Sequence, residues 1–157
     1  MSEVLKGVRV VDLTRGPAGG LATMIMADFG AEILVIEAPE RHGTDRLAAT
    51  PMWRRGKRIL PLDTKDAEQR KVLEELLAGA DVCLFNWRSQ VLEAQDLDFD
   101  SVHARHPHLI YCHISGFGSY GPKANYPGYE HLAAAASGRM QAFAAICDRA
   151  GPVYSAL

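Results

Sequence analysis

The amino-terminal part of the chain carries a strand–helix–strand pattern that few folds can accommodate. A β-branched run at residues 8–13 predicts a strand, which the glycines and the proline of residues 14–20 end. The Ala- and Met-rich residues 21–29 predict a buried helix that ends at Gly30, and residues 32–37 predict a second strand. Two strands joined through one helix form a parallel pair with a right-handed crossover.

The same alternation of strands and helices continues along the chain. The further expected elements are an edge strand at 59–62, a helix at 65–78, a strand at 81–85, one or two helical pieces at 91–105, a buried strand at 109–115 and a helix at 129–145. We therefore expect an α/β fold, with a Rossmann-like open, mostly parallel sheet and flanking helices. Ligands bind such sheets beyond the carboxyl ends of the strands, here in the loops after Leu13, Glu37, Phe85 and Ser115.

Composition excludes several classes of function. A chain of 157 residues provides one domain, 1–157. Its formal net charge of -2 disfavours nucleic-acid binding, no apolar run reaches the ~20 residues of a membrane helix, and the amino terminus lacks a signal-peptide pattern. Three widely spaced cysteines indicate neither disulfides nor a metal site, and the six scattered histidines include no zinc-binding pair. We expect a cytoplasmic protein without a bound metal, a nucleic-acid partner or a membrane.

Residues 116–121 match the dinucleotide-binding pattern GxGxxG and follow an expected strand. A pyrophosphate site needs a helix amino terminus directly after the glycines, but Pro122 and Lys123 follow here, and Pro127 delays the helix further. No acidic residue ends a next strand about twenty residues on, where it would hold a ribose. A tight loop is therefore the favoured interpretation.

Basic residues are concentrated between positions 41 and 58. They are Arg41, Arg46, Arg54, Arg55, Lys57 and Arg58, in a chain that is slightly acidic overall. Guanidinium groups bind phosphate oxygens in pairs and lysine adds a point charge, so this segment suits a multiply phosphorylated ligand. A solvated basic loop is the alternative interpretation.

Two other segments stand where strands are expected to end. The glycine-rich turn at residues 15–20 allows a ligand close to the backbone and precedes a helix amino terminus, which favours phosphate. Close packing of the strand against the helix is the alternative. Asn86-Trp87-Arg88 provides an aromatic ring and a guanidinium that can hold a planar ring by stacking, or it simply caps the loop. Spacing alone identifies no catalytic group.

Eight segments, taken in chain order, carry a more specific signal. They are 5–13, 17–19, 21–31, 36–46, 55–63, 80–88, 107–122 and 127–138. Characteristic stretches read ADFGA at 27–31, RGKR at 55–58, SGFG at 115–118 and PGYE at 127–130. Together these segments resemble the amino-terminal part of family III CoA-transferases, a family that includes carnitine-dehydratase-like proteins and alpha-methylacyl-CoA racemase.

The resemblance implies a Rossmann-like domain that holds CoA, in a homodimer of two interlocked ring-shaped chains. The family's transferases use acyl-CoA as a substrate, without a prosthetic group, and move CoA to a carboxylic acid. An aspartate nucleophile forms an acyl anhydride and then an enzyme–CoA thioester, which splits acyl exchange into easier steps. The matching position lies beyond Leu157, so we expect the amino-terminal part of the domain, with a sheet incomplete without carboxyl-terminal elements.

The resemblance also assigns residues to CoA contact: Arg15, Pro17, Ala18, Arg46, Arg55, Lys57, Arg58, Asn86, Trp87, Arg88, Tyr129 and Glu130. The sequence departs from the family pattern at several positions, including Gly20 in place of a proline and Ala38 in place of an arginine. Tyr129 occupies the position of the racemase branch's catalytic histidine, which favours transferase chemistry. An acyl-CoA racemase or dehydratase, and a non-catalytic CoA-binding or dimerisation module, are the alternatives.

Overall fold

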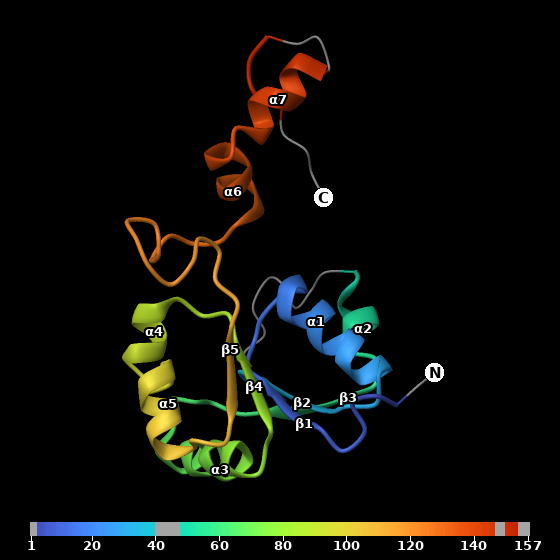
Figure 1. Ribbon diagram of the computed structural model, residues 1–157, viewed down its shortest axis with the longest axis vertical. Helices are drawn as coiled ribbons and strands as arrows, with labels where there is room; N and C mark the ends of the chain where they lie inside the picture. The colour runs from blue at the N-terminus through green and yellow to red at the C-terminus, as the bar shows by residue number, and fades with distance from the viewer. Residues whose placement is uncertain (1–2, 40–47, 147–149, 154–157) are drawn as a thin grey trace. The chain divides into compact units, whose positions relative to one another are not determined.

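The computed structural model describes residues 3–39, 48–146 and 150–153 (Figure 1). The chain divides into two compact units, Met1–Ile114 and Ser115–Leu157. Among the described residues, the first unit contains a five-stranded sheet with flanking helices, and the second contains a loop and two helices.

The sheet is entirely parallel and has the strand order β3-β2-β1-β4-β5. Its strands are β1 (Arg9–Asp12), β2 (Glu32–Glu37), β3 (Lys57–Pro61), β4 (Val82–Phe85) and β5 (Ile110–His113). The chain starts in the centre with β1, builds outward to β3, and then returns to the other side of β1 with β4. The order therefore reverses between β1 and β4, which is where open α/β sheets bind ligands.

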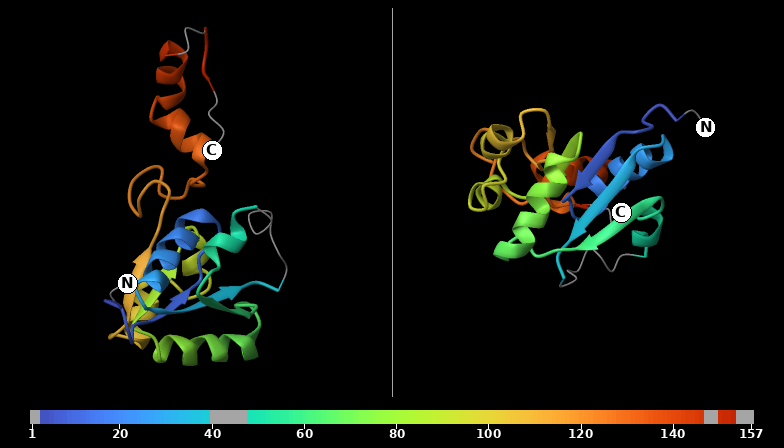
Figure 2. Two further views of the ribbon diagram at one scale, coloured as in Figure 1. Left: turned by 90° about the vertical axis from the view of Figure 1, so that its right-hand side faces the viewer. Right: turned by 90° about the horizontal axis from the view of Figure 1, so that it is seen from below.

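Helices cover both faces of the sheet, as Figures 1 and 2 show. One face carries α1 (Pro17–Asp28) and α2 (Thr50–Trp53). The other carries α3 (Ala67–Ala78), α4 (Ser89–Glu93) and α5 (Phe99–Arg105). The predicted open, parallel α/β fold is confirmed, as are the edge strand around Pro61 and the two helical pieces after β4.

Alternation along the strands divides the apolar side chains between two cores. The core beside α3, α4 and α5 contains Val11, Cys83 and Phe85, together with the completely buried Leu73 and Leu77 of α3. The smaller core beside α1 contains residues of the opposite strand face, namely Val10, Ile33, Val35 and Leu84. The central strands β1 and β4 are thus covered on both faces, and the loops that follow them start from fixed points.

The two long helices of the first unit begin beside the carboxyl edge of the sheet. The Asp66 carboxylate precedes α3 and accepts hydrogen bonds from the N–H groups of Glu68 and Gln69, at 3.1 and 2.9 Å. Pro17 begins α1, where its missing N–H leaves no intrahelical bond unmade, and it follows Gly16, which has a φ of 76°.

Two expectations of full burial are wrong. Leu21, Ile25 and Phe29 lie one helical turn apart on the outer side of α1 and are 39%, 51% and 44% exposed. The apolar composition of this helix therefore serves two faces, of which the sheet covers one. Strand β5 lies at an edge of the sheet that the described residues form, and Ile110 is 64% exposed.

The single helix expected at 129–145 is also wrong. The structure has two helices, α6 (Glu130–Ala136) and α7 (Arg139–Ile146), because Gly138 between them adopts a φ of 76° that ends α6. Within the described ranges, no helix has both the length and the apolar character needed to cross a membrane.

The second unit begins with a loop that glycines close at its base. A Cβ atom on Gly116 would lie 2.3 Å from the Cα atom of Gly128, so the two main chains meet where side chains do not fit. Gly118 and Gly121 have φ values of 86° and 93°, which other residues rarely adopt. The next helix, α6, does not follow these glycines directly. The GxGxxG pattern therefore builds a tight loop, as expected.

Candidate functional site

The loops after β1 and β4 meet where the strand order reverses. Asn86, which follows β4, binds the main chain of Arg15, which follows β1, through both polar groups of its side chain. Its Oδ1 accepts a hydrogen bond from the Arg15 N–H at 2.9 Å, and its Nδ2 donates to the Arg15 carbonyl at 2.7 Å. Asn86 therefore clamps the two loops together and fixes the main chain of Arg15 at the carboxyl edge.

Trp87 lies beside this clamp and contacts the side chain of Arg15. The guanidinium carbon is 5.6 Å from the centre of the indole ring, within the range of a cation–π contact. The ring meets Phe85 edge-on at a centroid distance of 6.3 Å, and His113 Nε2 hydrogen-bonds to the Trp87 carbonyl at 2.8 Å. Trp87 is thus held through its ring and its main chain, while its indole Nε1 is buried with no partner in the described part of the chain.

Helix α1 presents its amino terminus at the same edge. None of the described side chains caps this terminus, and Pro17 and Ala18 in its first turn are exposed. Free N–H groups and the helix dipole favour an anion at such a position. Close packing, the alternative interpretation of the glycine-rich turn, holds at Gly19, because a Cβ atom there would lie 1.7 Å from Thr14 Oγ1.

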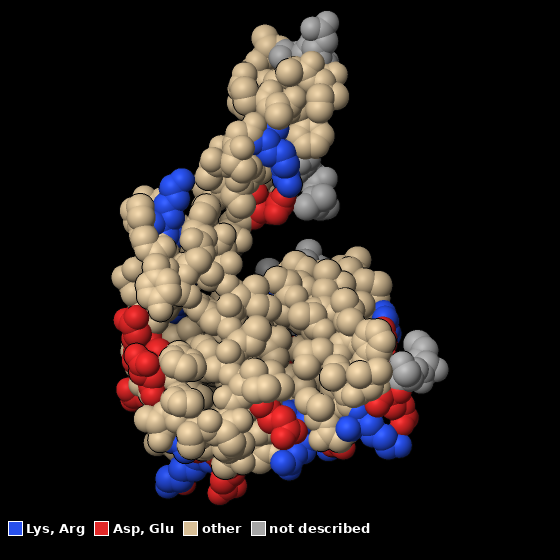
Figure 3. Space-filling model, in the orientation of Figure 1, with Lys and Arg blue, Asp and Glu red and all other residues tan. Residues whose placement is uncertain are grey.

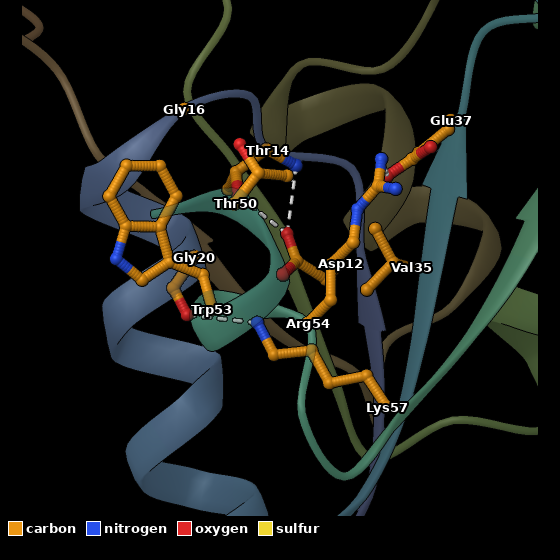
Figure 4. A pocket seen from close by; sticks show the side chains of 10 residues that line it. All are labelled: Asp12, Thr14, Gly16, Gly20, Val35, Glu37, Thr50, Trp53, Arg54 and Lys57. Atoms are coloured by element: carbon orange, nitrogen blue, oxygen red, sulfur yellow. Dashed lines mark hydrogen bonds and ion pairs between the residues drawn. The ribbon is translucent and has the colours of Figure 1, made fainter. Parts of the chain in front are cut away.

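A buried polar network lies beneath α1 (Figure 4). The Asp12 carboxylate is 2% exposed and accepts hydrogen bonds from the N–H and hydroxyl groups of Thr14, at 2.9 and 2.6 Å, and from the Thr23 hydroxyl at 2.6 Å. Lys57 Nζ donates to Thr23 Oγ1 at 2.6 Å and to the Gly20 carbonyl at 2.9 Å. Burial lowers the pKa of Lys57, and the charge of Asp12 opposes this shift. The Lys57 ammonium therefore joins β3 to α1 inside the protein.

A small cavity adjoins this network, lined also by Thr50, Trp53, Arg54 and Glu37 (Figure 4). The guanidinium of Arg54 binds the carboxylate of Glu37 there. Thr50 Oγ1 is buried and lacks a hydrogen-bond partner among the described residues. The volume of about 50 Å³ is far below the ~300–1,000 Å³ of ligand pockets, so the cavity that the described residues form is too small for a whole coenzyme.

Two other cations of the basic segment pair with carboxylates at the opposite edge of the sheet. Arg55 binds Asp28 at the end of α1, and Arg58 Nη2 lies 3.4 Å from Glu32 Oε2 at the start of β2. Since α1 runs back from the carboxyl edge, both carboxylates lie at the amino-terminal ends of the strands. Figure 3 shows basic and acidic atoms side by side along the lower border of the first unit.

A profile of CoA-transferase family III matches residues 5–155. The chain belongs to CoA-transferase family III. The match covers nearly the whole chain, and the resemblance carried by the eight ordered segments is confirmed.

Named members of CoA-transferase family III are about one-third identical to this chain. Human succinyl-CoA:glutarate CoA-transferase is 35% identical over 146 residues, which are 87% of this chain and 33% of that protein. The succinate–glutarate CoA-transferase of Agrobacterium fabrum is 35% identical over 153 residues, 38% of its length. A formyl-CoA:oxalate CoA-transferase of Escherichia coli is 33% identical over 149 residues, 36% of its length. The chain thus spans little more than a third of the relatives it matches.

A solved structure supports the same assignment to family III. A CAIB/BAIF family protein from Brucella suis superposes with a TM-score of 0.78 at 34% identity, covering 89% of this chain and 40% of that chain. The α/β fold described above is therefore the fold of this family member over the shared residues.

The structure brings together five of the residues that the family resemblance assigns to CoA. These lie at the β1/β4 edge and are Arg15, Pro17, Ala18, Asn86 and Trp87. Arg88 follows them, exposed, immediately before α4. The predicted loops after two neighbouring strands therefore do form one surface.

Three of the other assigned residues lie elsewhere in the first unit. Arg55 and Arg58 are at the amino-terminal edge, and Lys57 points under α1. In the second unit, Tyr129 directly precedes α6 and Glu130 begins it, where Glu130 pairs with Arg139. Arg46 lies outside the described residues.

Sequence reasoning missed two features of this region. The first is the buried polar network that Asp12 and Thr23 form. A carboxylate at the end of an apolar strand was a visible sign of such a network. Lys65 follows β3, is exposed, and stands at the carboxyl edge together with Arg15 and Arg88. No charged side-chain nitrogen of these three residues lies within 4.0 Å of a carboxylate of the described chain. The rule that ligands lie beyond strand ends, applied to β3, identifies Lys65.

Proposed function

We propose that the chain forms the CoA-binding part of an enzyme that transfers CoA from an acyl-CoA to a carboxylic acid. Membership of CoA-transferase family III supports CoA transfer, and the names of the relatives support acyl-CoA and carboxylate substrates. The observation that carries the proposal is the cluster of Arg15, Asn86 and Trp87 at the β1/β4 edge, beside the uncapped amino terminus of α1.

This cluster provides groups that match the chemistry of CoA. CoA carries several phosphate charges, which exposed guanidinium groups and a free helix terminus bind well. Because Asn86 fixes the main chain of Arg15, the guanidinium can move from the Trp87 ring to a phosphate without displacing the loop. Asn86 itself has both polar groups engaged, and its contribution to CoA binding is to hold this geometry.

Asp12 is unsuited to act as the carboxylate nucleophile of such a transferase. It is almost fully buried, and its two oxygens accept three hydrogen bonds from Thr14 and Thr23. A nucleophile must instead reach the acyl carbon with a free lone pair. Asp12 therefore supports the loop after β1, and the covalent chemistry belongs to another carboxylate.

The remaining assignments stay predictions. Arg55 and Arg58 would have to leave Asp28 and Glu32 before binding a phosphate, and Lys57 would have to leave α1. CoA contact by these three, and by Arg46, Tyr129 and Glu130, rests on the resemblance, as do a homodimer and a cytoplasmic location. In this proposal CoA and acyl-CoA are substrates and not prosthetic groups.

Titration calorimetry with CoA tests the proposal through two arginines of the same strand region. Arg15→Ala removes the guanidinium at the carboxyl edge, and we expect affinity to fall roughly tenfold or more, the contribution of a charged hydrogen bond. Arg9→Ala is the matched control, because Arg9 is an exposed arginine at the amino end of β1. Equal loss in both variants, or no CoA binding by the unmodified protein, would contradict the proposal.

A further inference from the structure

His113 makes a hydrogen bond that extends beyond the β-sheet ladder. It is the last residue of β5 and lies in register with Phe85, the last residue of β4. The ladder ends where the Ile114 N–H donates to the Phe85 carbonyl at 2.8 Å. Beyond β4, the next carbonyl that points toward β5 is that of Trp87. The side chain of His113 reaches it, with Nε2 2.8 Å from the carbonyl oxygen.

The chemistry of this contact fixes the proton on His113. A carbonyl oxygen only accepts hydrogen bonds, so Nε2 must carry the hydrogen and donate it. Both the neutral tautomer with Nε2–H and the imidazolium have this donor. The property that the site requires at position 113 is therefore an N–H at the Nε2 position, and a positive charge is not needed.

The Trp87 carbonyl lies between the Asn86 clamp and the start of α4. On one side, Asn86 clamps the main chain of Arg15. On the other, the Arg88 carbonyl accepts hydrogen bonds from the first turn of α4. A displacement of the main chain at Trp87 would move the indole ring away from the Arg15 guanidinium and pull on the Asn86 clamp. His113 is thus placed to hold the segment 86–88 against such a displacement.

We propose that His113 is a positioning residue of the CoA site and acts through Trp87, an inference that rests on the proposed function. It joins the end of β5 to the loop after β4, as Asn86 joins that loop to the one after β1. Three strand ends are thereby tied into one surface by two side chains. His113 need not touch CoA for its loss to weaken CoA binding.

Three substitutions separate donor geometry from polarity and bulk. In glutamine, the amide nitrogen is three bonds from Cβ, as Nε2 is in histidine, so His113→Gln can restore the donor. In asparagine, the amide nitrogen is one bond closer, so His113→Asn keeps an amide but falls short of the Trp87 carbonyl. His113→Ala removes the donor altogether.

Fluorine NMR of the protein labelled with 5-fluorotryptophan reads the two tryptophans of this chain, Trp53 and Trp87, separately. Each resonance is assigned by its loss in a Trp→Phe variant. We expect the Trp87 resonance to shift or broaden in His113→Ala and His113→Asn and to keep its wild-type position in His113→Gln. The Trp53 resonance reports on the fold near α2 and should stay unchanged in all three.

CoA affinity should follow the same order. We expect it to fall roughly three- to tenfold in the alanine and asparagine variants, the value of one hydrogen bond, and to be retained in the glutamine variant. An unchanged Trp87 resonance in His113→Ala, or a glutamine variant as impaired as the asparagine one, would overturn the inference. Where alanine also disturbs Trp53, the comparison of the two amides decides. Failure of the unmodified protein to bind CoA would instead overturn the proposed function, and the Trp87 resonance would still decide whether His113 orders this loop.

Discussion

Replacing Thr23 with valine tests the polar network beneath α1. Thr23 is completely buried, and its hydroxyl lies 2.6 Å from both Asp12 Oδ2 and Lys57 Nζ. Valine has nearly the same shape but no hydroxyl. The Asp12 carboxylate then loses one of three donors, and the Lys57 ammonium loses one of two acceptors. Both lost hydrogen bonds involve a charged group, namely the buried Asp12 carboxylate and the half-buried Lys57 ammonium.

The magnitude follows from the two bonds. A hydrogen bond to a charged group contributes about 1.5–3 kcal/mol, so the pair amounts to roughly 3–6 kcal/mol without relaxation. Water entering the adjoining cavity can replace part of this, and we expect the free energy of unfolding to fall by about 3 kcal/mol. Serine keeps the hydroxyl and removes one methyl group, for which a loss of about 1 kcal/mol is expected.

Urea unfolding followed by circular dichroism measures both variants against the unmodified protein. We expect the urea midpoint to fall much further for Thr23→Val than for Thr23→Ser. The slope of the unfolding free energy against urea concentration should be the same in both variants. Equal losses in the two variants, or a loss below about 1 kcal/mol in the valine variant, would show that the hydroxyl does not connect Lys57 to Asp12.

Two other predictions concern a buried thiol and the closed loop. Burial raises the pKa of the Cys83 thiol from 9.0 to about 12, so above pH 9 the unfolded chain loses a proton that the folded protein keeps, and stability falls as the pH rises from 9 toward 12. Urea midpoints measured on either side of pH 9 should fall less steeply with rising pH in Cys83→Ala than in the unmodified protein. The same pH dependence in both proteins would count against the Cys83 thiol as the cause. Gly116→Ala forces a Cβ atom against Gly128, so trypsin should cut after Lys123 faster than in Ser119→Ala, a change at an exposed position of the same loop; equal cleavage rates would argue against closure at the loop base.

The fold could be predicted from sequence because its signals are local. The β-branched strands, the breaking glycines and the crossover rule determine a parallel sheet whose loops gather at one edge. Burial was harder to predict, because the apolar composition of α1 does not reveal that Leu21, Ile25 and Phe29 face away from the sheet. Whether an apolar face is covered depends on what packs against it, which no local pattern contains.

The basic segment shows why part of the site could not be predicted. Four cations between residues 54 and 58 are neighbours in sequence, and they suggest one phosphate-binding surface. Strand β3 begins at Lys57, so alternation turns Lys57 under α1 and sends Arg58 to the other side, toward Glu32. Arg54 meets Glu37, near the carboxyl edge, while Arg55 meets Asp28, at the amino-terminal edge. Basic residues that are neighbours in sequence therefore contact different parts of the structure.

Apart from Arg54, which is paired with Glu37, the cations at the two edges of the sheet also differ in whether a carboxylate already neutralises them. A phosphate that recruits Arg55 or Arg58 must displace a carboxylate, and exchanging one anion for another gains little. Arg15 and Arg88 face no carboxylate of the described chain within 4.0 Å, so a phosphate there gains the contact without breaking an ion pair. Arg15 is in addition held at its main chain by Asn86, which reduces the ordering that binding requires. The arginines are distributed along the sequence, but the strand order determines which of them lie beside a carboxylate. Among the described residues, the arginines that remain unpaired, and can therefore attract a polyanion, lie at the carboxyl edge.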